Sequence, residues 1–343
     1  MKSTVIAIDL AKDVFEVLIS RKPGQVTSRH RVARKKLAAL LEQQPESTVL
    51  LEACSTSHHW GRRFLRMGHD VRLLPPHLVR PYVQGNKTDR TDAKGMLEAY
   101  RNEEIRPVPV KSVEQQAALS LHRFRSRWQG ERTARINAVR GTLREFGFVI
   151  PVGARHVVPT VRAWVEDSES DLPDLLRPVL YRACEEIDQL TEEVANIDRQ
   201  LQRFARQDVR AQWLMSVPGI GVITATALVA FVGDASRFKS CRSFANFFGL
   251  TPREHSTGSR RWLGSISKRG DTYLRTLLIH GARSVLISAK RSKEPNRLHR
   301  WGLHLASSSG HNTAAVAIAN KMARFAWAVW TQERMFVPFE KAA

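Results

Sequence analysis

A long apolar repeat in the middle of the chain constrains the fold more than any other stretch. Its apolar residues follow alternating steps of three and four, namely Leu180, Ala183, Ile187, Leu190, Val194, Ile197, Leu201 and Phe204. This spacing places them along one stripe of a long α-helix, which is stable when another helix covers that stripe. The repeat therefore predicts a coiled-coil arm, closed either within one chain or between two copies of it.

A second long helix is predicted over residues 113–147, and it is strongly basic. It carries many arginines against only three glutamates, and we predict contacts to nucleic acid for Arg123, Arg127 and Arg135. Arginine suits phosphate because its planar guanidinium group donates two parallel hydrogen bonds. A solvated helix face is the alternative for such a run, but the imbalance of charge favours phosphate.

The excess of positive charge extends to the whole chain. Its 54 Lys and Arg residues against 33 Asp and Glu give a formal net charge of +21 at pH 7. That charge predicts attraction to phosphate backbones, with binding that weakens as salt rises. The sequence shows no lipid-anchor motif, no long apolar span and no signal-peptide core near its first residues, so we expect no membrane partner. Nucleic acid is the predicted class of partner.

Cysteine and histidine are not spaced as ligands of a metal ion. Cys54, Cys184 and Cys241 are odd in number and far apart, so we expect reduced thiols in the core of a cytoplasmic protein. His58 and His59 are adjacent, and on a helix their side chains point about 100° apart. They therefore make a poor chelating pair.

The first 105 residues alternate between the patterns of strands and helices. Strands are predicted over residues 4–9, 14–20, 26–32, 48–53 and 70–75, and helices over residues 35–43 and 57–68. Three strands in succession, followed by alternating helix and strand, are expected of an antiparallel set joined to a parallel portion. This is the order of a ribonuclease H-like α/β fold.

Four acidic residues fall at the ends of these elements or close after them. Asp9 ends the first strand, Glu52 ends the buried run TVLLE, and Asp89 and Asp92 lie three residues apart at the start of a predicted helix. Residues at this spacing share one helix face. Taken alone, the pair fits a solvated first helical turn, but the two strand-end acids favour a Mg²⁺ site for phosphoryl transfer.

The region from residue 211 onward is predicted to be mainly helical. It opens with the turn Pro218-Gly219-Ile220-Gly221 directly before an apolar helix, which is similar to a helix-hairpin-helix motif. In such a motif the glycines expose backbone N–H groups to a phosphate, without selecting any base. The alternative is an ordinary glycine turn between packed helices.

A hydroxyl-rich segment, Ser256-Thr257-Gly258-Ser259, lies within a basic stretch of the same region and is predicted to be a flexible turn. We predict that the basic residues around it bind nucleic acid, namely Arg253, Arg260, Arg261, Lys268 and Arg269. A hydroxyl beside arginines can attack phosphorus when the cations stabilise the charge that grows on the phosphoryl oxygens. On residue chemistry alone, a passive phosphate-binding loop is the alternative.

These motifs, in this order, resemble the DEDD transposases of bacterial insertion sequences, a group that includes the Piv DNA invertases. The matching segments cover nearly the whole chain and are IAIDLAKD, LLEACSTSHHW, NKTDRTDA, SVPGIG, FFGLTPREHSTGS and SISKRGDTYLRTLLIHGAR. The resemblance implies a RuvC-like catalytic domain over residues 1–105, a helical coiled-coil arm over residues 106–210 and a C-terminal transposase domain over residues 211–343.

The resemblance also implies a chemistry. Asp9, Glu52, Asp89 and Asp92 match the four acids of the family, which with Mg²⁺ activate a DNA phosphate for attack by a serine of the C-terminal domain. The product is a 5′-phosphoserine link, formed at a composite site in a homodimer or homotetramer. A structured non-coding RNA is implied as the guide that pairs with donor and target DNA, in the bacterial cytoplasm at the nucleoid.

The sequence departs from the family at the expected nucleophile. Many relatives have serine directly before the glycine, whereas here Thr257 precedes Gly258. An ungapped match assigns the role to Thr257, and a shift of one residue assigns it to Ser256. We favour Ser256 because its primary hydroxyl is less hindered for in-line attack, with Ser259 third.

Two other functions remain open from the sequence. In one, the acids work as a RuvC-like nuclease that hydrolyses DNA junctions with water, and the serine loop only binds. In the other, the chain is a non-enzymatic scaffold for nucleic acid.

Overall fold

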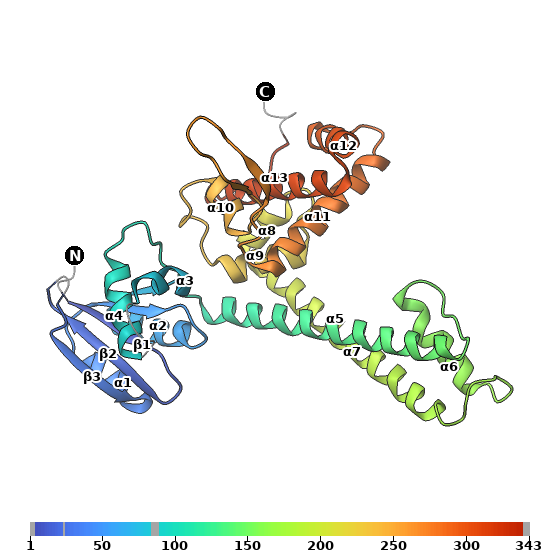
Figure 1. Cartoon of the computed structure of the whole chain (residues 1–343), viewed down its shortest axis with the longest axis horizontal. Coiled ribbons are helices and arrows are strands. Elements are labelled where there is room, and N and C mark those ends of the chain that lie inside the picture. Colours follow the sequence, from blue (N-terminus) through green and yellow to red (C-terminus); the bar gives the residue numbers. More distant parts are fainter. Residues whose placement is uncertain (1–3, 23–24, 84–88, 339–343) are drawn as a thin grey trace. The chain divides into compact units, whose positions relative to one another are not determined.

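Two compact units make up the chain in the computed structural model, residues 1–116 and residues 117–343 (Figure 1). The structure describes residues 4–22, 25–83 and 89–338, without the side chains of residues 89 and 90. No helix in these ranges is both long enough and apolar enough to span a bilayer. The division of the chain into three domains remains a prediction.

A five-stranded mixed sheet lies at the centre of the first unit. Its strands, in the spatial order β3-β2-β1-β4-β5, are β1 (Val5–Asp9), β2 (Val14–Ser20), β3 (Ser28–Ala33), β4 (Thr48–Glu52) and β5 (Asp70–Leu74). The pairs β1–β2 and β2–β3 are antiparallel, whereas β1–β4 and β4–β5 are parallel. This is the mixed α/β arrangement that the sequence predicts, and it fits a RuvC-like domain.

Helices cover both faces of this sheet. The helices of the unit are η1 (Arg34–Lys36), α1 (Leu37–Glu42), α2 (Ser57–Arg66), α3 (Pro76–Val79), η2 (Arg80–Tyr82) and α4 (Asp89–Tyr100). Successive residues of a strand point to opposite faces. Ile8 therefore packs with Trp60 of α2 on one face, and Ala7 packs with Met96 of α4 on the other.

The second unit is helical apart from one hairpin. Its elements are α5 (Val113–Glu145, beginning in the first unit), η3 (Ala154–His156), α6 (Val157–Glu166), α7 (Arg177–Gln207), α8 (Val209–Met215), α9 (Val222–Val232), α10 (Cys241–Phe247), β6 (Pro252–Glu254), β7 (Leu263–Ile266), α11 (Thr272–Arg291), α12 (Arg297–Ser309) and α13 (His311–Thr331). The largest core of the unit joins α8 to α13 and includes Phe244, Leu278 and Ile318. The mainly helical C-terminal region is thus confirmed.

The apolar stripe of α7 is covered by other helices of its own unit. Of the residues in the predicted seam, Leu180, Ile187, Val194, Ile197 and Leu201 are buried. Helix α6 packs against the first part of α7 and α9 against the last part. In the seam Cys184 is buried in place of Ala183, which is only partly buried. A coiled coil in the strict sense, and any seam between copies, remain predictions.

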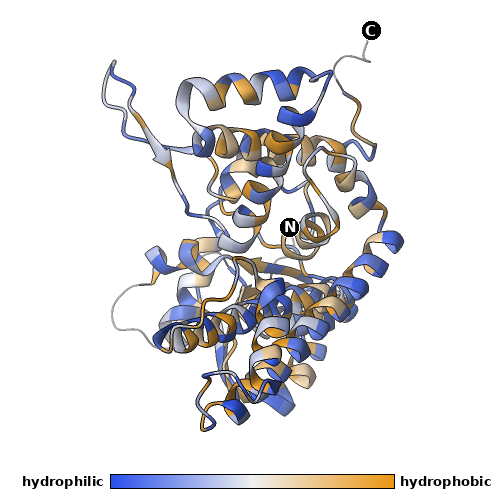
Figure 2. Cartoon of the chain, turned by 90° about the vertical axis from the view of Figure 1, so that its right-hand side faces the viewer, coloured by the Kyte–Doolittle hydropathy of each residue, from blue (hydrophilic) through white to orange (hydrophobic). Residues whose placement is uncertain are grey.

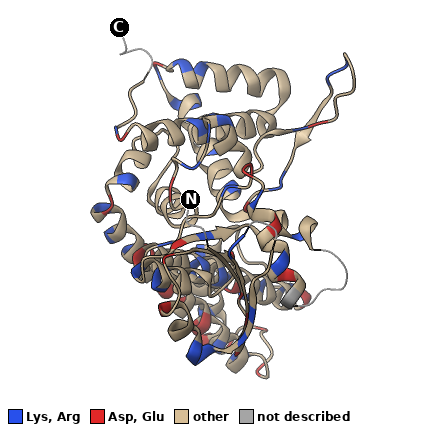
Figure 3. Ribbon diagram, turned by 90° about the vertical axis from the view of Figure 1, so that its left-hand side faces the viewer, with Lys and Arg blue, Asp and Glu red and all other residues tan. Residues whose placement is uncertain are grey.

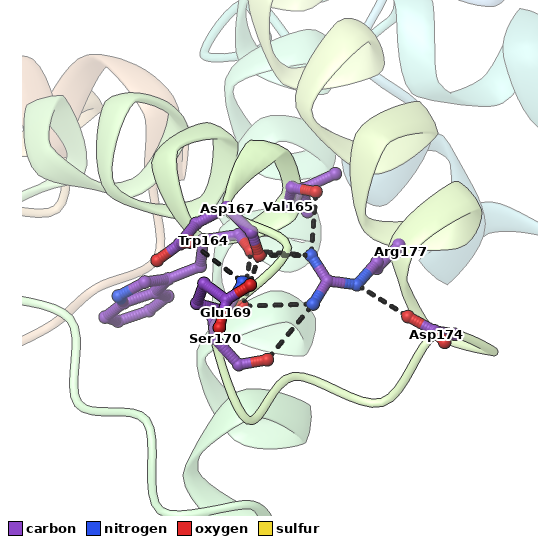
Figure 4. Close-up of polar contacts among 7 residues, drawn as sticks. All are labelled: Trp164, Val165, Asp167, Glu169, Ser170, Asp174 and Arg177. Atoms are coloured by element: carbon purple, nitrogen blue, oxygen red, sulfur yellow. Dashed lines mark hydrogen bonds and ion pairs between the residues drawn. The ribbon is translucent and has the colours of Figure 1, made fainter.

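Arg177 fixes the turn that leads from α6 into α7 (Figure 4). Its guanidinium group donates hydrogen bonds to the carbonyl oxygens of Trp164, Val165, Asp167 and Ser170, at 2.8–3.1 Å. These carbonyls come from the end of α6 and the turn after it, where no helical N–H group is available to pair with them. One partly buried arginine thus satisfies four backbone acceptors and orders the end of the arm.

The three cysteines are free thiols. Cys184 is fully buried, and burial raises the pKa of its thiol. Cys54 and Cys241 are only partly buried. The prediction of a core thiol therefore holds for Cys184 alone.

A fully buried histidine, His122, joins three helices of the second unit. Its Nε2 lies 3.1 Å from the hydroxyl of Thr226 on α9, and its Nδ1 lies 3.0 Å from the hydroxyl of Tyr273 on α11. The Thr226 hydroxyl donates to the carbonyl of Val222, so it accepts from Nε2–H. Nδ1 then accepts from Tyr273, and the neutral ring is fully satisfied.

This histidine makes the stability of the second unit depend on pH. Burial, and then the nearby Arg125, lower the pKa of His122 to about 4 from an ordinary value of 6.5. Because the unfolded chain binds the proton more readily, the contribution of His122 is complete above pH 6.5 and is lost as the pH falls toward 4. The difference corresponds to about 3 kcal/mol.

We expect His122→Gln to remove this part of the pH dependence. Urea unfolding of the variant and of the parent, compared between pH 7.5 and 4.5, measures the difference. The matched control is His304→Gln, an exposed position with no such network. Equal pH dependence in the parent and His122→Gln would show that the ring is not held neutral.

Candidate active site

Two of the predicted acids end neighbouring parallel strands. Ile8 of β1 lies opposite Leu51 of β4, and continuing this register by one residue places Asp9 beside Glu52. Both acids are partly buried, and each has an interaction partner in the structure. They alternate with Ile8 and Leu51, so they share the sheet face that α4 covers.

The third acid, Asp92, lies on the helix that covers this face. It precedes Met96 by four residues and Ala99 by seven, which places it on the same side of α4 as these two buried residues. Asp92 itself is partly buried. Three of the four predicted acids therefore belong to one side of the sheet.

The fourth predicted acid, Asp89, is the first residue of α4. Its side chain lies outside the described part of the structure. The backbone spacing of three residues from Asp92 is as predicted.

A further carboxylate, Glu16, was not predicted. In the antiparallel register of β1 and β2 it lies directly opposite Asp9, so the two side chains share a face. Its Oε2 atom is buried without a hydrogen-bond partner among the described residues. The sequence held a signal for it, because an acid stands in the otherwise apolar strand VFEVLIS.

Carboxylates on one face suit a hard cation such as Mg²⁺, which takes oxygen ligands. Among the described side chains, however, no three His, Cys, Asp or Glu residues are arranged to hold a metal ion. The donor chemistry therefore fits Mg²⁺, while the four-acid metal site remains a prediction.

The two adjacent histidines of α2 have separate surroundings. Nδ1 of His58 accepts a hydrogen bond from the backbone N–H of Lys111, at 3.2 Å. His59 is exposed on the helix surface. One ring is thus half-buried and hydrogen-bonded to the backbone, and the other is exposed.

The hydroxyl-rich segment forms the tip of a β-hairpin rather than a loose turn. Strands β6 and β7 pair antiparallel, and His255 N–H donates to the carbonyl of Trp262 at 3.0 Å. Thr257 and Arg260 exchange two backbone hydrogen bonds of 3.1 Å, which closes a turn at Gly258-Ser259. The hairpin projects from the helices of its own unit (Figures 1 and 2).

This pairing separates the two candidate nucleophiles. Opposite residues of a hairpin share a face, and successive residues alternate. Ser256 lies opposite Arg261 and on the same face as Glu254, whereas Thr257 lies on the other face with His255. The two hydroxyls therefore have different neighbours.

Ser256 has an acid beside it. Its Oγ donates a hydrogen bond of 2.7 Å to Oε1 of Glu254, and Arg261 Nε donates to the same oxygen at 3.0 Å. The Ser256 hydroxyl, and then Arg261, lower the pKa of Glu254. Glu254 is therefore an anion near neutral pH that accepts from the serine. Glu254 lies two residues before Ser256 on the same arm, so their shared face follows from the extended backbone of the hairpin, and the place of Arg261 follows from the cross-strand register. The sequence did not predict either feature.

The basic residues predicted around the hairpin are all exposed, namely Arg253, Arg260, Arg261, Lys268 and Arg269. Arg275 differs, because it donates to the carbonyls of Phe248, Lys268 and Gly270 and so holds the base of the hairpin. Lys and Arg are spread over both units of the chain (Figure 3). The cations near Ser256 are accessible to a phosphate backbone.

Two of the three basic residues predicted on α5 have acidic partners. Arg135 forms an ion pair with Glu186 of α7, and Arg127 forms one with Glu131 within α5. Arg123 is exposed and has no such partner in the described part of the chain. Contact of these residues with nucleic acid remains a prediction.

Gly219 and Gly221 lie in different environments. A Cβ atom at Gly219 would stand 2.8 Å from the carbonyl oxygen of Gly281 on α11, and Gly219 has a φ of +85°. Gly221 caps the N-terminus of α9, is exposed and has open space around it. Close packing therefore explains Gly219, and Gly221 alone is open to a phosphate. The helix-hairpin-helix assignment remains a prediction.

We expect Gly219→Ala to lower the free energy of unfolding by about 3 kcal/mol, because it adds both overpacking and a strained φ. Gly221→Ala, the matched control, should cost about 1 kcal/mol or less, since it weakens only the N-cap of α9, with a φ of −93° and open space around a new Cβ. Urea unfolding of both variants measures the difference. An equal effect at the two positions would contradict the packing explanation.

Two families of known proteins match this chain, one in its C-terminal region and one in its N-terminal region. Residues 211–298 match the family described as "Transposase IS116/IS110/IS902 family", and residues 6–148 match the transposase family DEDD_Tnp_IS110. A "Probable family 20 transposase" of Pseudomonas aeruginosa is 42% identical over 98% of this chain and 100% of its own length. The "Transposase for insertion sequence element IS1111A" of Coxiella burnetii is 36% identical over 97% of this chain and 91% of its own.

Similarity to an invertase is more limited. The "Pilin gene-inverting protein" of Moraxella lacunata is 33% identical over 137 residues, which is 38% of this chain and 39% of that protein. A special relationship to the Piv invertases therefore remains a prediction.

Proposed function

The chain belongs to the IS116/IS110/IS902 family of insertion-sequence transposases, and from this premise we propose that it cuts and rejoins DNA through a covalent link to Ser256. It is a DNA transposase. The proposal adds the nucleophile, the Mg²⁺ ions and a guide RNA. The observation that carries it is the contact of the Ser256 hydroxyl with the carboxylate of Glu254, which Arg261 holds in place.

In the proposed step, Oγ of Ser256 forms a bond to phosphorus while the bond from phosphorus to the 3′ oxygen breaks. The hydroxyl proton passes to Oε1 of Glu254, and the departing 3′ oxygen takes a proton from water. The strand is left with a 5′-phosphoserine link on one side and a 3′ hydroxyl on the other. Arg261 and the other exposed cations of the hairpin stabilise the charge on the phosphoryl oxygens.

Asp9, Glu52, Asp89 and Asp92 are the residues that would hold Mg²⁺. When bound, Mg²⁺ neutralises charge on the phosphate and orients it for in-line displacement. The shared sheet face of Asp9, Glu52 and Asp92 supports this assignment. Glu16, opposite Asp9, adds a fourth carboxyl group whose place on the same side of the sheet is described.

Guidance by a structured non-coding RNA rests on the family resemblance and on the net charge of +21. In this proposal pairing with the RNA selects the donor and target DNA, and the protein binds backbones in a homodimer or homotetramer. Sequencing of RNA that co-purifies with the protein tests it directly.

The proposed covalent link has a direct test. DNA labelled on the 5′-phosphate side of the cut should migrate with the protein on a denaturing gel, and the phosphorylated peptide should contain Ser256. Free 5′ phosphates without any adduct would instead support the second candidate function, a RuvC-like nuclease that uses water.

We expect Glu254→Gln to slow adduct formation by about 10²-fold, because the amide cannot accept the serine proton. Affinity for DNA should stay within a factor of a few, which separates this role from a loss of binding. The matched control is Glu294→Gln, an exposed glutamate far along the sequence from the hairpin. An unchanged rate in Glu254→Gln would show that the contact with Ser256 is not used in the reaction.

A further inference from the structure

A compact group of cations lies on the sheet face opposite the predicted acids. We call it the α2 basic face, and it consists of Arg34 of η1 and His59, Arg62, Arg63 and Arg66 of α2. Helix α2 packs on the sheet through Trp60 and Phe64, together with Ile8 and Leu51 of the strands. Asp9 and Glu52 alternate with Ile8 and Leu51 and so point to the other side. The α2 basic face is therefore separate from the predicted catalytic face of the same unit.

A buried tryptophan holds two of these arginines in fixed positions. Trp60 is only 3% exposed, and the guanidinium carbons of Arg34 and Arg63 lie 5.7 and 5.6 Å from its ring centre. Arg34 also donates to the carbonyl of Lys12 at 3.0 Å. Such contacts reduce the rotamer freedom that an arginine loses when it binds a ligand.

Little acid compensates the α2 basic face: Glu114 interacts electrostatically with Arg62, whose guanidinium group also donates to the carbonyl of Lys111 and to Oε1 of Gln116. In the described part of the chain, none of its arginines forms an ion pair with Asp or Glu, whereas Arg125, Arg135 and Arg162 of the second unit each have an acidic partner. Burial and then all four arginines of the face lower the pKa of His59, with no acid acting in the other direction. Its electrostatic potential is strongly positive.

The spacing of these residues suits a polyanion. His59, Arg63 and Arg66 follow steps of four and three, so they form one stripe along α2, about 10 Å long at 1.5 Å per residue. Arg63 and Arg66 are exposed at its end. The Trp60 ring at its centre is buried and so is not available for stacking of bases, which favours a duplex over single-stranded nucleic acid.

We propose that the α2 basic face binds the phosphodiester backbone of a nucleic acid duplex, independently of its sequence. One duplex held there leaves the acidic face of the sheet free to act on another strand. Both DNA and RNA duplexes offer this backbone, and the binding does not depend on the serine chemistry.

The test compares two triple variants of the full chain. Arg34→Gln/Arg63→Gln/Arg66→Gln removes three cations of the face, and Arg21→Gln/Arg80→Gln/Arg101→Gln removes three exposed cations elsewhere in the first unit. Affinity for a DNA duplex and for an RNA duplex of unrelated sequence is measured over a series of KCl concentrations.

We expect the first variant to lower the slope of log affinity against log salt by about 2 to 3 for at least one duplex. Its affinity should fall on the order of 10-fold or more, and the control should change much less. Loss with RNA alone identifies an RNA duplex as the ligand, and loss with DNA alone identifies DNA. Equal effects of the two variants on both duplexes would overturn the proposal.

A second measurement does not depend on the folding of a variant. Ultraviolet crosslinking of the unaltered protein to each duplex, followed by mass spectrometry, should place crosslinks in residues 57–66. Crosslinks confined to the second unit would contradict the proposal, even if the triple variant lost affinity.

Discussion

Replacing Ser256 with alanine is expected to abolish the covalent protein–DNA adduct and to reduce strand exchange by at least about 10³-fold, as removal of a nucleophile does. The reason is geometric. Ser256 is the hydroxyl of the hairpin that faces a carboxylate, at 2.7 Å, and an arginine on the opposite strand. Strand exchange is measured with a reporter plasmid, and the adduct on a denaturing gel.

The controls for this experiment come from the same hairpin. Thr257→Val keeps the shape of the neighbouring side chain but removes its hydroxyl, and Ser259→Ala removes the third one. Both should retain the adduct, because Thr257 lies on the face opposite Glu254 and Ser259 lies in the unpaired turn at the tip. Loss of the adduct in Thr257→Val, with retention in Ser256→Ala, would move the nucleophile to the face of His255 and contradict the assignment.

Replacing Asp9 with asparagine is expected to lower strand exchange by at least about 10³-fold, with little change in affinity for DNA. The substitution keeps the size of the side chain at the end of β1 but removes a charged oxygen ligand for Mg²⁺. Strand exchange and adduct formation are measured over a series of Mg²⁺ concentrations. A partial recovery at high Mg²⁺ would be consistent with a weakened metal site.

The matched control for Asp9 is Asp70→Asn. Asp70 begins β5, at the opposite end of the parallel strands, and pairs with Arg72. Its replacement removes the same charge from the same sheet, so it should leave strand exchange within a factor of a few. Full activity of Asp9→Asn would show that Asp9 takes no part in the reaction and has only a structural role.

The acidic face could be predicted from the sequence because local patterns determine it. The runs TVIAID and TVLLE each end in an acid, and strand ends in a parallel pair meet at one edge of the sheet. The period of two then fixes the side to which Asp9 and Glu52 point. Glu16 was missed because its place beside Asp9 depends on the register of two paired strands.

The hairpin shows where local patterns fail. The stretch from His255 to Arg261 is polar and lacks the apolar alternation by which a strand is recognised, so the sequence predicts only a flexible turn at Ser256-Thr257-Gly258-Ser259. Backbone pairing between its two arms gives it order instead. The contact of Ser256 with Glu254 follows from the extended backbone of one arm, and the contact of Arg261 with Glu254 follows from the pairing of the two arms.

The basic helix α5 shows a related limit. Charge imbalance along the helix indicates nucleic acid, but part of that charge is neutralised by residues distant in the sequence. Arg125 is 14% exposed and pairs with Asp198, and Arg135 pairs with Glu186. These acids belong to α7, so only the packing of the two helices shows that the arginines also have a structural role.

The alternation of side chains along the hairpin also limits how this gene can vary. Deleting or inserting one codon between the position of Glu254 and the tip would exchange the sides on which the serine and threonine hydroxyls emerge. An insertion sequence whose gene acquired such an insertion or deletion would have to use the other hydroxyl as its nucleophile, or it would lose the ability to transpose. Length changes in natural copies of the element should therefore occur in pairs of residues, or beyond the turn.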